Sequence, residues 1–293
     1  MELRQLEYFQ SVAKLGSISK AADLHNITQP SVSVAIKNLE KELGVKLLDR
    51  SRKRCTLTSE GHIFLQRVNF LLGCFHDILL EMNDYRIPQK GQVKIGITPI
   101  MGTLLFPHAF ANFQKENPDV NIIIEEEGSL VIRNKLEQGE LDLGIMVTSN
   151  LPSPLDVFQI TTGQIHVYLP PDDPFSSYPS VPLEKLRDHP FILFKEDTYM
   201  RQMILDECAR LNFSPSVVFS SSQIGTILSL VEQGTGITFF LEGVLKESRN
   251  VISRPLSDPL HLDVGLAWNK DRYLSKTAKL FIESLQKTFR TSK

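Results

Sequence analysis

The sequence predicts a mixed α/β protein, in which an N-terminal winged helix-turn-helix and a long linker helix precede a two-lobed α/β domain. Three observations support this prediction. Residues 1–58 contain short helical repeats of apolar residues separated by turns, residues 59–90 follow one long helical pattern, and residues 91–293 alternate strand and helix patterns. A length of 293 residues suits about two domains of roughly 100 to 200 residues each.

The composition is that of a globular protein, with 42% hydrophobic and 23% charged residues. No apolar run approaches the roughly 20 residues of a membrane span, and the first residues lack the pattern of a secretory signal, so we expect a cytoplasmic protein without membrane partners. Cys55, Cys74 and Cys208 form no zinc motif and no disulfide framework. Residues 1–60 carry ten Lys and Arg against seven Asp and Glu. This basic excess favours an N-terminal module that binds a polyanion.

Apolar residues at helical spacing predict three short helices near the start. The first covers residues 4–14 and ends at Gly16, and Ser17 is expected to cap the second. The buried side of the second helix is expected to consist of Ile18, Ala21, Ala22 and Leu24. Thr28 caps the third helix, which Gly44 ends. The buried stripe of this third helix is expected to consist of Val32, Ile36, Leu39 and Leu43. The short turn between the last two helices has the length found in a helix-turn-helix.

A basic hairpin and a long helix are predicted next. The stretch LLDRSRKRCTLT places apolar residues on either side of a basic tip, which is typical of a wing. From Thr58 onward apolar residues step by threes and fours until Pro88 and Gly91 break the pattern. Such a long stripe predicts a partner helix from a second copy of the chain, and packing on its own domain is the alternative. The residues expected at this dimer contact are Leu65, Val68, Leu72, Phe75, Leu79 and Met82.

The remainder is predicted to form βαβ units around parallel strands. The strands VKIGIT, VNIIIEEEG and LDLGIMV alternate with helices in a first lobe, and QIHVYLP, PFILF, SVVFSSS and GITFFL belong to a second lobe. The last strand, LDVGLAWN, and a helix over 275–289 have no partner in the second lobe, so we expect the chain to cross back. Lobe one would comprise about residues 91–162 and 266–293, and lobe two about residues 163–265.

The third helix keeps small hydroxyls and amides on a face that never becomes apolar. A helix in the major groove of DNA must offer hydrogen-bonding groups, and Gln29 can pair with N6 and N7 of adenine. A merely solvated polar face is the alternative, but the helix-turn-helix spacing and the adjacent basic wing favour DNA. The residues expected to contact double-stranded DNA are Thr28, Gln29, Pro30, Ser31, Ser33, Lys37, Arg50, Arg52, Lys53 and Arg54.

Five segments carry a resemblance to a known family. They are LEYFQSVAKLGSISKAADLHNITQPSVSVAIKNLEKELGVKLLDR, the downstream LTSEG, LLFPHAFANFQKENPDV, LEQGELDLGIM and LVEQGTGITFFLEGVL. Through them the chain resembles LysR-type transcriptional regulators along its whole length. One departure is Val34, which stands where the family often has Arg or another long polar side chain.

The resemblance implies that the second helix of a winged helix-turn-helix enters the major groove and that the linker helix dimerises. It also implies a two-lobed effector domain like periplasmic binding proteins, which senses a small molecule. Members commonly assemble as homo-oligomers that bend promoter DNA and relax the bend when an inducer binds. We therefore expect promoter DNA, a small-molecule effector, a second copy of the chain in a dimer or tetramer, and RNA polymerase as partners.

The effector is expected at the strand ends that face the lobe interface, because open α/β sheets bind ligands at the carboxyl ends of their strands. Arg201 is the only guanidinium in this set and can clamp a carboxylate, which would suit an organic acid. Each single Ser or Thr is equally consistent with a cap or turn. The residues expected in the effector site are Thr98, Met101, Gly102, Thr103, Ser129, Thr148, Thr198, Tyr199, Arg201, Gln223 and Phe239.

Two other functions compete with that of a regulator. A small-molecule enzyme with an accessory DNA-binding module is disfavoured, because the histidines form no zinc motif, no serine lies in G-x-S-x-G and EQGTGIT is no dinucleotide fingerprint. We therefore expect no catalytic residues, metal or cofactor. The other alternative binds ligand or DNA without promoter specificity, whereas a regulator should prefer its site over random duplex by ~10³ or more.

Overall fold

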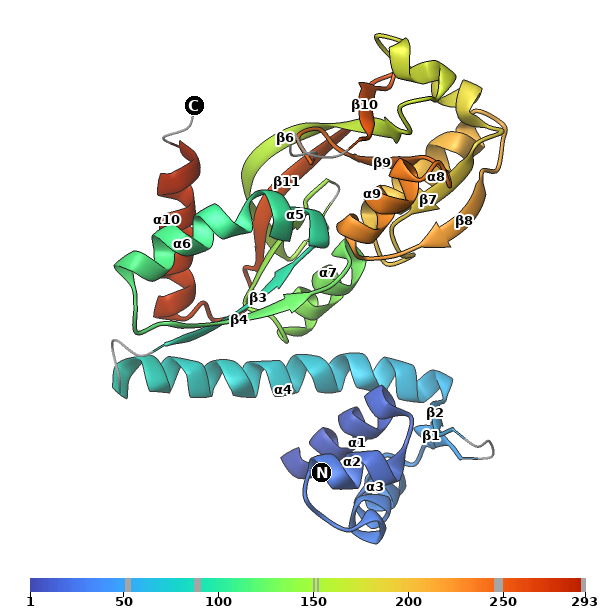
Figure 1. Ribbon diagram of the computed structural model, residues 1–293. Helices are drawn as coiled ribbons and strands as arrows, with labels where there is room; N and C mark the ends of the chain where they lie inside the picture. Colours follow the sequence, from blue (N-terminus) through green and yellow to red (C-terminus); the bar gives the residue numbers. More distant parts are fainter. Residues whose placement is uncertain (51–53, 87–90, 150, 152, 245–249, 291–293) are drawn as a thin grey trace. The chain divides into compact units, whose positions relative to one another are not determined.

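The computed structural model describes residues 1–50, 54–86, 91–149, 151, 153–244 and 250–290. The chain separates into two compact units, Met1–Asn83 and Asp84–Lys293 (Figure 1). The boundary between the two units lies near the end of the predicted long helix. The predicted helix-turn-helix domain, residues 1–58, and most of the predicted linker, residues 59–90, therefore belong to the same unit. Those domain boundaries remain a prediction.

Three helices form the core of the first unit, close to where apolar spacing predicted them. They are α1 (Leu3–Leu15), α2 (Ile18–Leu24) and α3 (Gln29–Leu43). The predicted caps are confirmed, because Ser17 accepts a hydrogen bond from the amide of Lys20 and Gly16 adopts the left-handed conformation with φ of 62°. Two expected core residues are wrong. Leu24 is 64% exposed and Leu43 is 36% exposed, since each ends its helix beyond the packed face.

A small wing and a long helix complete the first unit. The wing pairs β1 (Leu48–Asp49) with β2 (Thr56–Leu57) in antiparallel register, and α4 (Ser59–Arg86) follows. Thr58 begins this helix, because its Oγ1 accepts from the amide of Gly61 at 2.9 Å and donates to the carbonyl of Lys46 at 2.7 Å. The wing and the start of α4 are thereby joined.

The helix α4 is long and apolar enough over Ser59–Tyr85 to cross a membrane, by length and composition alone. Charged residues such as Arg67 and Asp77 interrupt it, which is why no continuous apolar run stands out in the sequence. One helix of this kind is weak evidence for a membrane protein.

A seven-stranded sheet organises the second unit. Its parallel part consists of β3 (Gln92–Ile97), β4 (Asn121–Glu126) and β5 (Leu143–Val147), as predicted. The strand order is β10-β6-β11-β5-β3-β4, with β9 also paired to β6. The antiparallel strands are β6 (Leu155–Leu169), β9 (Thr238–Leu241), β10 (Ile252–Pro255) and β11 (His261–Asn269). A separate parallel pair consists of β7 (Pro190–Leu193) and β8 (Ser216–Ser220).

Helices pack against the sheet, and their apolar side chains contribute to the hydrophobic core of the second unit. They are α5 (Pro99–Leu104), α6 (Phe106–Glu116), α7 (Ser129–Gln138), α8 (Tyr199–Arg210), α9 (Ile224–Glu232) and α10 (Lys276–Arg290). Phe113 of α6 packs against Phe281 of α10, with ring centroids 5.0 Å apart. On α7, Ile132 lies against Gly144 of β5, where an added Cβ would come within 2.8 Å of its side chain. The segment between β3 and β4, where the alternation of strands and helices predicts a helix, holds two helices divided at Leu105, since Pro107 lies in the first turn of α6 and lacks an amide donor.

The predicted return of the chain to the first lobe is confirmed, because β11 pairs with β5. The strand predicted to begin at Gln164 begins at Leu155, however, and pairs with β11 along its first part. Both predicted lobe boundaries, at residues 162/163 and 265/266, therefore fall inside continuous strands.

Candidate nucleic-acid interface

The outward face of α3 carries most of the residues predicted to contact DNA. Thr28 caps the helix, with its Oγ1 3.4 Å from the amide nitrogen and 2.8 Å from the hydroxyl of Ser31. On the opposite side Val32, Ile36 and Leu39 are fully buried, which fixes the rotation of the helix. Ser33 is half-buried. The exposed residues of the predicted set on this helix and its cap are Thr28, Gln29, Pro30, Ser31 and Lys37.

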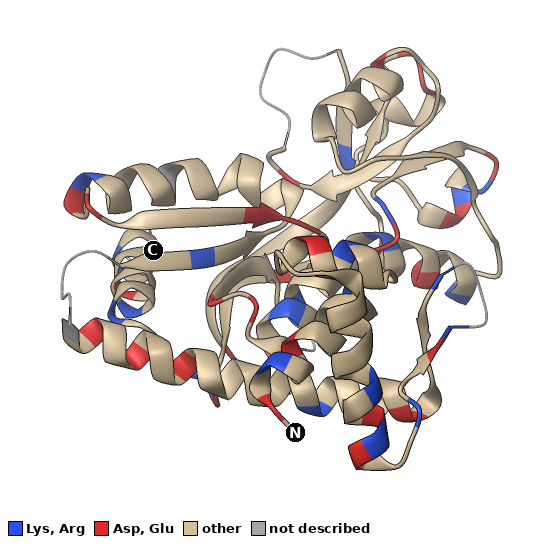
Figure 2. Ribbon diagram, turned by 90° about the horizontal axis from the view of Figure 1, so that it is seen from below, with Lys and Arg blue, Asp and Glu red and all other residues tan. Residues whose placement is uncertain are grey.

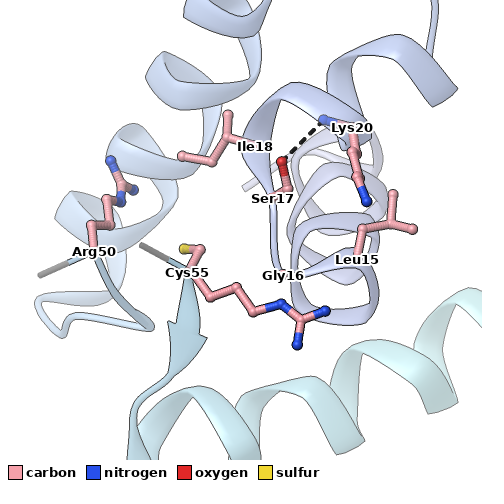
Figure 3. A pocket seen from close by; sticks show the side chains of 8 residues that line it. Leu15, Gly16, Ser17, Ile18, Lys20, Arg50 and Cys55 are labelled. Atoms are coloured by element: carbon pink, nitrogen blue, oxygen red, sulfur yellow. Dashed lines mark hydrogen bonds between the residues drawn. The ribbon is translucent and has the colours of Figure 1, made fainter. Parts of the chain in front are cut away.

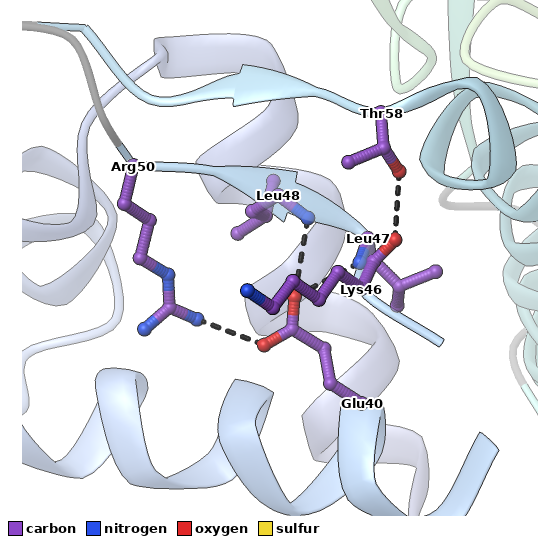
Figure 4. Close-up of polar contacts among 6 residues, drawn as sticks. All are labelled: Glu40, Lys46, Leu47, Leu48, Arg50 and Thr58. Atoms are coloured by element: carbon purple, nitrogen blue, oxygen red, sulfur yellow. Dashed lines mark hydrogen bonds and ion pairs between the residues drawn. The ribbon is translucent and has the colours of Figure 1, made fainter. Parts of the chain in front are cut away.

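One carboxylate holds the wing against α3. Glu40 accepts hydrogen bonds through Oε1 from the amides of Leu47 at 2.9 Å and Leu48 at 3.1 Å (Figure 4). Its Oε2 lies 3.2 Å from Nη2 of Arg50. The Glu40 side chain is only 15% exposed, and both of its carboxylate oxygens bind groups of the wing. Sequence reasoning missed Glu40, because no local pattern shows that a helix carboxylate will accept amides seven and eight residues later.

Basic side chains surround two hollows beside the wing. The first has a volume of about 330 Å³ and lies between the α1–α2 turn and the wing (Figure 3). It is lined by Leu15, Gly16, Ser17, Ile18, Lys20, Arg50, Arg54 and Cys55. The second, of about 580 Å³, is lined by Lys37, Glu40, Lys46, Leu48, Asp49, Arg50 and Thr58. Lys20 and Lys46 thus join the predicted Arg50 and Arg54, whereas the predicted Arg52 and Lys53 lie outside the described residues.

The wing is also tied to the first helices. The amide of Cys55 donates to the carbonyl of Gly16 at 3.1 Å, and partial burial raises the pKa of the Cys55 thiol although nearby Arg50 opposes the shift. Acidic and basic residues are interspersed along the helices and loops of both units (Figure 2). Within the first unit, Lys20, Lys46, Arg50 and Arg54 border the hollows beside the wing, whereas Arg4 and Arg67 are exposed on α1 and α4.

The predicted dimer stripe on α4 divides into two parts. Val68 is 2% exposed, and Leu65 and Leu72 pack against the same core, so these three residues stabilise their own unit. Phe75, Leu79 and Met82 are 40%, 53% and 54% exposed. Further exposed apolar residues of α4, which were not in the predicted set, are Ile63, Phe70, Leu71, Ile78 and Tyr85.

The residues predicted to bind an effector differ in burial and in hydrogen bonding. Met101 and Phe239 are 1% and 2% exposed and belong to the hydrophobic core, so their side chains are structural. Thr98, at the end of β3, has a buried hydroxyl without a hydrogen-bond partner among the described residues, and Ser129 is buried at the start of α7. Gly102, Thr103, Thr148, Tyr199 and Gln223 are half-buried or exposed, and Tyr199 packs against the hydrophobic core.

Two more predicted effector residues already have partners. Arg201 donates through Nη1 to the carbonyl of Phe194 and to the hydroxyl of Ser220, each at 2.8 Å. It thereby joins the ends of β7 and β8. The hydroxyl of Thr198 donates to the carbonyl of Lys195 at 2.9 Å, as expected of a turn residue.

Asp197 links the two lobes and was not predicted. Its Oδ2 accepts from the amide of Gly128 at 3.1 Å, and its carbonyl accepts from the amide of Leu130 at 3.2 Å. These amides begin α7, where the helix dipole favours negative charge. A Cβ on residue 128 would lie 2.2 Å from the Asp197 carbonyl oxygen, so this close approach requires Gly128.

Comparisons with known proteins match both units. A family described as "Bacterial regulatory helix-turn-helix protein, lysR family" matches residues 3–62, and one described as "LysR substrate binding domain" matches residues 87–290. The uncharacterised HTH-type transcriptional regulator YwbI of Bacillus subtilis (strain 168) is 33% identical over 97% of this chain and 95% of its own length.

Two solved structures show the same fold. Full-length OxyR from Pseudomonas aeruginosa, in a cysteine-to-aspartate variant, is 24% identical with a TM-score of 0.69, covering 98% of this chain and 95% of its own. Full-length CbnR, solved with its target DNA, is 17% identical with a TM-score of 0.64, covering 98% of this chain and 100% of its own.

Proposed function

The chain belongs to the LysR family of transcriptional regulators, and from this premise we propose which of its residues contact DNA, a second copy and the effector. It is a DNA-binding transcriptional regulator with an effector-binding domain, and it is not an enzyme. In this proposal residues 1–58 bind DNA, residues 59–90 form the linker that dimerises, and residues 91–293 bind the effector. The protein acts in the cytoplasm, where promoter DNA is accessible.

The outward face of α3 is the observation that carries the DNA proposal. Gln29, Ser33 and Lys37 offer an amide, a hydroxyl and an ammonium on or beside this face, opposite a stripe that is fully buried. In a helix-turn-helix the first residues of the second helix contact base edges, and Gln29 is the first residue of α3. Thr28, Pro30 and Ser31 complete the helix start that approaches the duplex.

The wing supplies phosphate contacts in this proposal. Arg50 and Arg54, with Lys20 and Lys46 added by the structure, surround the hollows described above. The logarithm of the affinity falls linearly with the logarithm of the salt concentration, and each phosphate contact should make this slope more negative by about 0.9. Arg52 and Lys53 are retained as proposed contacts on the basis of the sequence.

The experiment that tests the DNA proposal compares two variants of the full chain. Specific DNA is first selected from random duplexes with the wild-type protein, which should prefer it over random sequence by ~10³ or more. Exchanging Gln29, Ser33 and Lys37 together for alanine should remove most of this preference. In the control variant Gln66 and Arg67, both exposed on α4, are exchanged for alanine. This variant should keep the wild-type preference for the selected DNA. If the triple variant is folded and still selective, the proposed interface is wrong.

Dimerisation is proposed to use the exposed apolar part of α4. Ile78, Leu79 and Met82 are each more than half exposed, and exposed apolar surface of this extent favours burial against a second copy. Two recognition helices about 34 Å apart could then read an inverted repeat. Replacing Ile78 and Met82 by Lys should shift the chain toward monomer in sedimentation velocity, whereas replacing the core contact Leu72 would mainly lower stability. An unchanged oligomer would refute this assignment.

The last turn of α4 supports a connection between the linker and the effector domain. Asp84 Oδ2 accepts from the hydroxyl of Tyr273 at 3.1 Å and from the amide of Lys276 at 2.7 Å. The Lys276 ammonium donates back to the Asp84 carbonyl at 2.9 Å. The linker end is therefore anchored at the start of α10, where a rearrangement of the effector domain could reach it.

The effector is proposed to be a small organic acid bound at the strand ends around Thr98 and Ser129. The buried hydroxyl of Thr98 lacks a partner among the described residues, and the amide of Gly128 at the start of α7 already donates to the carboxylate of Asp197. Arg201 retains guanidinium donors besides Nη1. A carboxylic acid that binds should raise the melting temperature of the full chain, because a ligand at a hundredfold excess over its Kd stabilises the folded state by about 2.7 kcal/mol. A panel of small carboxylic acids is therefore screened. The corresponding neutral amides are the control, and equal shifts with acids and amides would contradict the proposal.

RNA polymerase is proposed as a further partner on the premise that the protein regulates transcription at promoters. A pull-down of polymerase by the promoter-bound regulator, compared with promoter DNA alone, tests this contact.

A further inference from the structure

One apolar side chain stands in the middle of the polar face of α3. Val34 is 56% exposed, whereas Val32, Ile36 and Leu39 on the same helix are fully buried. At 100° per residue, Val34 lies roughly 165° around the helix axis from the mean direction of those buried residues. It therefore occupies the centre of the outward face and contributes nothing to the core.

The immediate neighbours of Val34 are polar or open to solvent. One turn away on either side lie Ser31, Lys37 and Asn38, all exposed. Val34 also lines an open groove of about 600 Å³ between α1 and α3, together with Pro30 and Ala35 on the α3 side. The isopropyl group thus meets solvent beside a hollow, and the polar side chains of Ser31, Lys37 and Asn38 lie one turn away.

A valine cannot donate or accept a hydrogen bond, so it cannot recognise base edges in the way that Gln29 or Lys37 can. The major groove displays one apolar group, the C5-methyl of thymine, against which a small aliphatic side chain packs. A phosphate would gain no hydrogen bond from this side chain. Burial against a methyl group is therefore the contact that the exposed valine fits.

We propose that Val34 is a specificity-determining residue that reads the C5-methyl of a thymine in each half-site of the operator. This inference rests on the proposed placement of α3 in the major groove. It differs from the contacts of Gln29, Ser33 and Lys37, because it concerns a methyl group and not a hydrogen bond. The expected consequence is a position of the operator at which thymine is preferred over uracil, although the two bases pair identically.

The experiment uses the full-length protein and DNA that it selects from a pool of random duplexes. Each thymine of the selected sequence is replaced in turn by deoxyuridine, which removes only the C5-methyl. At the position that Val34 reads, affinity should fall about fourfold for one half-site and about fifteenfold for both, since one buried methyl-sized group accounts for about a fourfold factor. The same measurements are made with Val34→Ala and with Val45→Ala.

Val45 is the matched control, because it is 42% exposed in the same unit but lies beyond the end of α3 at Gly44. V34A should lose most of the discrimination between the thymine and deoxyuridine duplexes, because its side chain is two methyl groups shorter, and V45A should discriminate like the wild type. The inference is overturned if no thymine is sensitive to loss of its methyl, or if the sensitive thymine is equally sensitive with V34A. In both cases selective binding persists and the proposed function stands. If no sequence is enriched at all, the proposed function and this inference fail together.

Discussion

Replacing Glu40 by alanine tests whether this carboxylate joins the wing to α3. The change removes the acceptor of the Leu47 and Leu48 amides and the partner of Arg50. A buried donor left without an acceptor costs about 1–3 kcal/mol, and the wing can recover part of this by admitting water. We therefore expect the free energy of unfolding of the first unit to fall by about 2–4 kcal/mol.

The unfolding of the full chain in urea is monitored by circular dichroism. The affinity of each folded variant for DNA is measured separately. Glu42→Ala is the matched control on the same helix, because Glu42 pairs only with the exposed N-terminal ammonium among the contacts described, and its side chain is 52% exposed. Such exposed pairs contribute about 0–1 kcal/mol. The Glu40→Gln variant keeps one oxygen for the two amides but weakens the pair with Arg50, so it should lie between the wild type and the alanine variant.

The reasoning about Glu40 is refuted if E40A and E42A unfold at the same urea concentration. A loss of DNA affinity in E40A without a loss of stability would also contradict it, because the argument requires that the wing loosens. The result expected is a lower unfolding midpoint together with weaker DNA binding.

Three further predictions concern other contacts. Gly61→Ala should lower the urea midpoint of the first unit by the equivalent of about 1–3 kcal/mol, because the new Cβ would lie 2.1 Å from the Leu47 carbonyl oxygen; an unchanged midpoint would show that α4 shifts freely. Asp197→Asn should lower the stability of the second unit by about 0.3–1 kcal/mol in thermal unfolding, since a charge at the start of α7 is lost, and equal stability would contradict this. Burial raises the pKa of the Cys208 thiol from 9.0 to about 12, so the unfolded chain releases this proton first and stability should fall as pH rises above 9.0 toward 12. Cys208→Ala should make that alkaline fall shallower, and identical pH profiles would exclude the thiol as its source.

Local signals in the sequence predicted the first unit well. Ser17, Thr28 and Gly44 determine helix ends through their own hydroxyls or left-handed backbone, so a single residue and its neighbours suffice to recognise them. Leu24 was misassigned because helical periodicity says which residues share a face, but not where the neighbouring helix stops covering it.

Contacts between distant segments could not be predicted in the same way. Glu40 and Asp197 act on amides that the fold brings to them, and neither residue type has a sequence pattern that identifies its partner. Met101, in the helix that follows β3, and Phe239, inside β9, show the related difficulty for apolar residues near a predicted site. An apolar residue there lines a binding site or enters the core according to its rotation, which the sequence does not specify.

The two strands that connect the lobes form one ribbon. β6 and β11 are hydrogen-bonded to each other from Leu155 and Asn269 to Gln164 and His261, with one register shift between Val264 and Gly265. Sliding one lobe past the other would break this ladder, whereas a change of ribbon twist preserves most of it. From this pairing we expect an effector to change the twist of the β6–β11 ribbon rather than to separate the lobes widely.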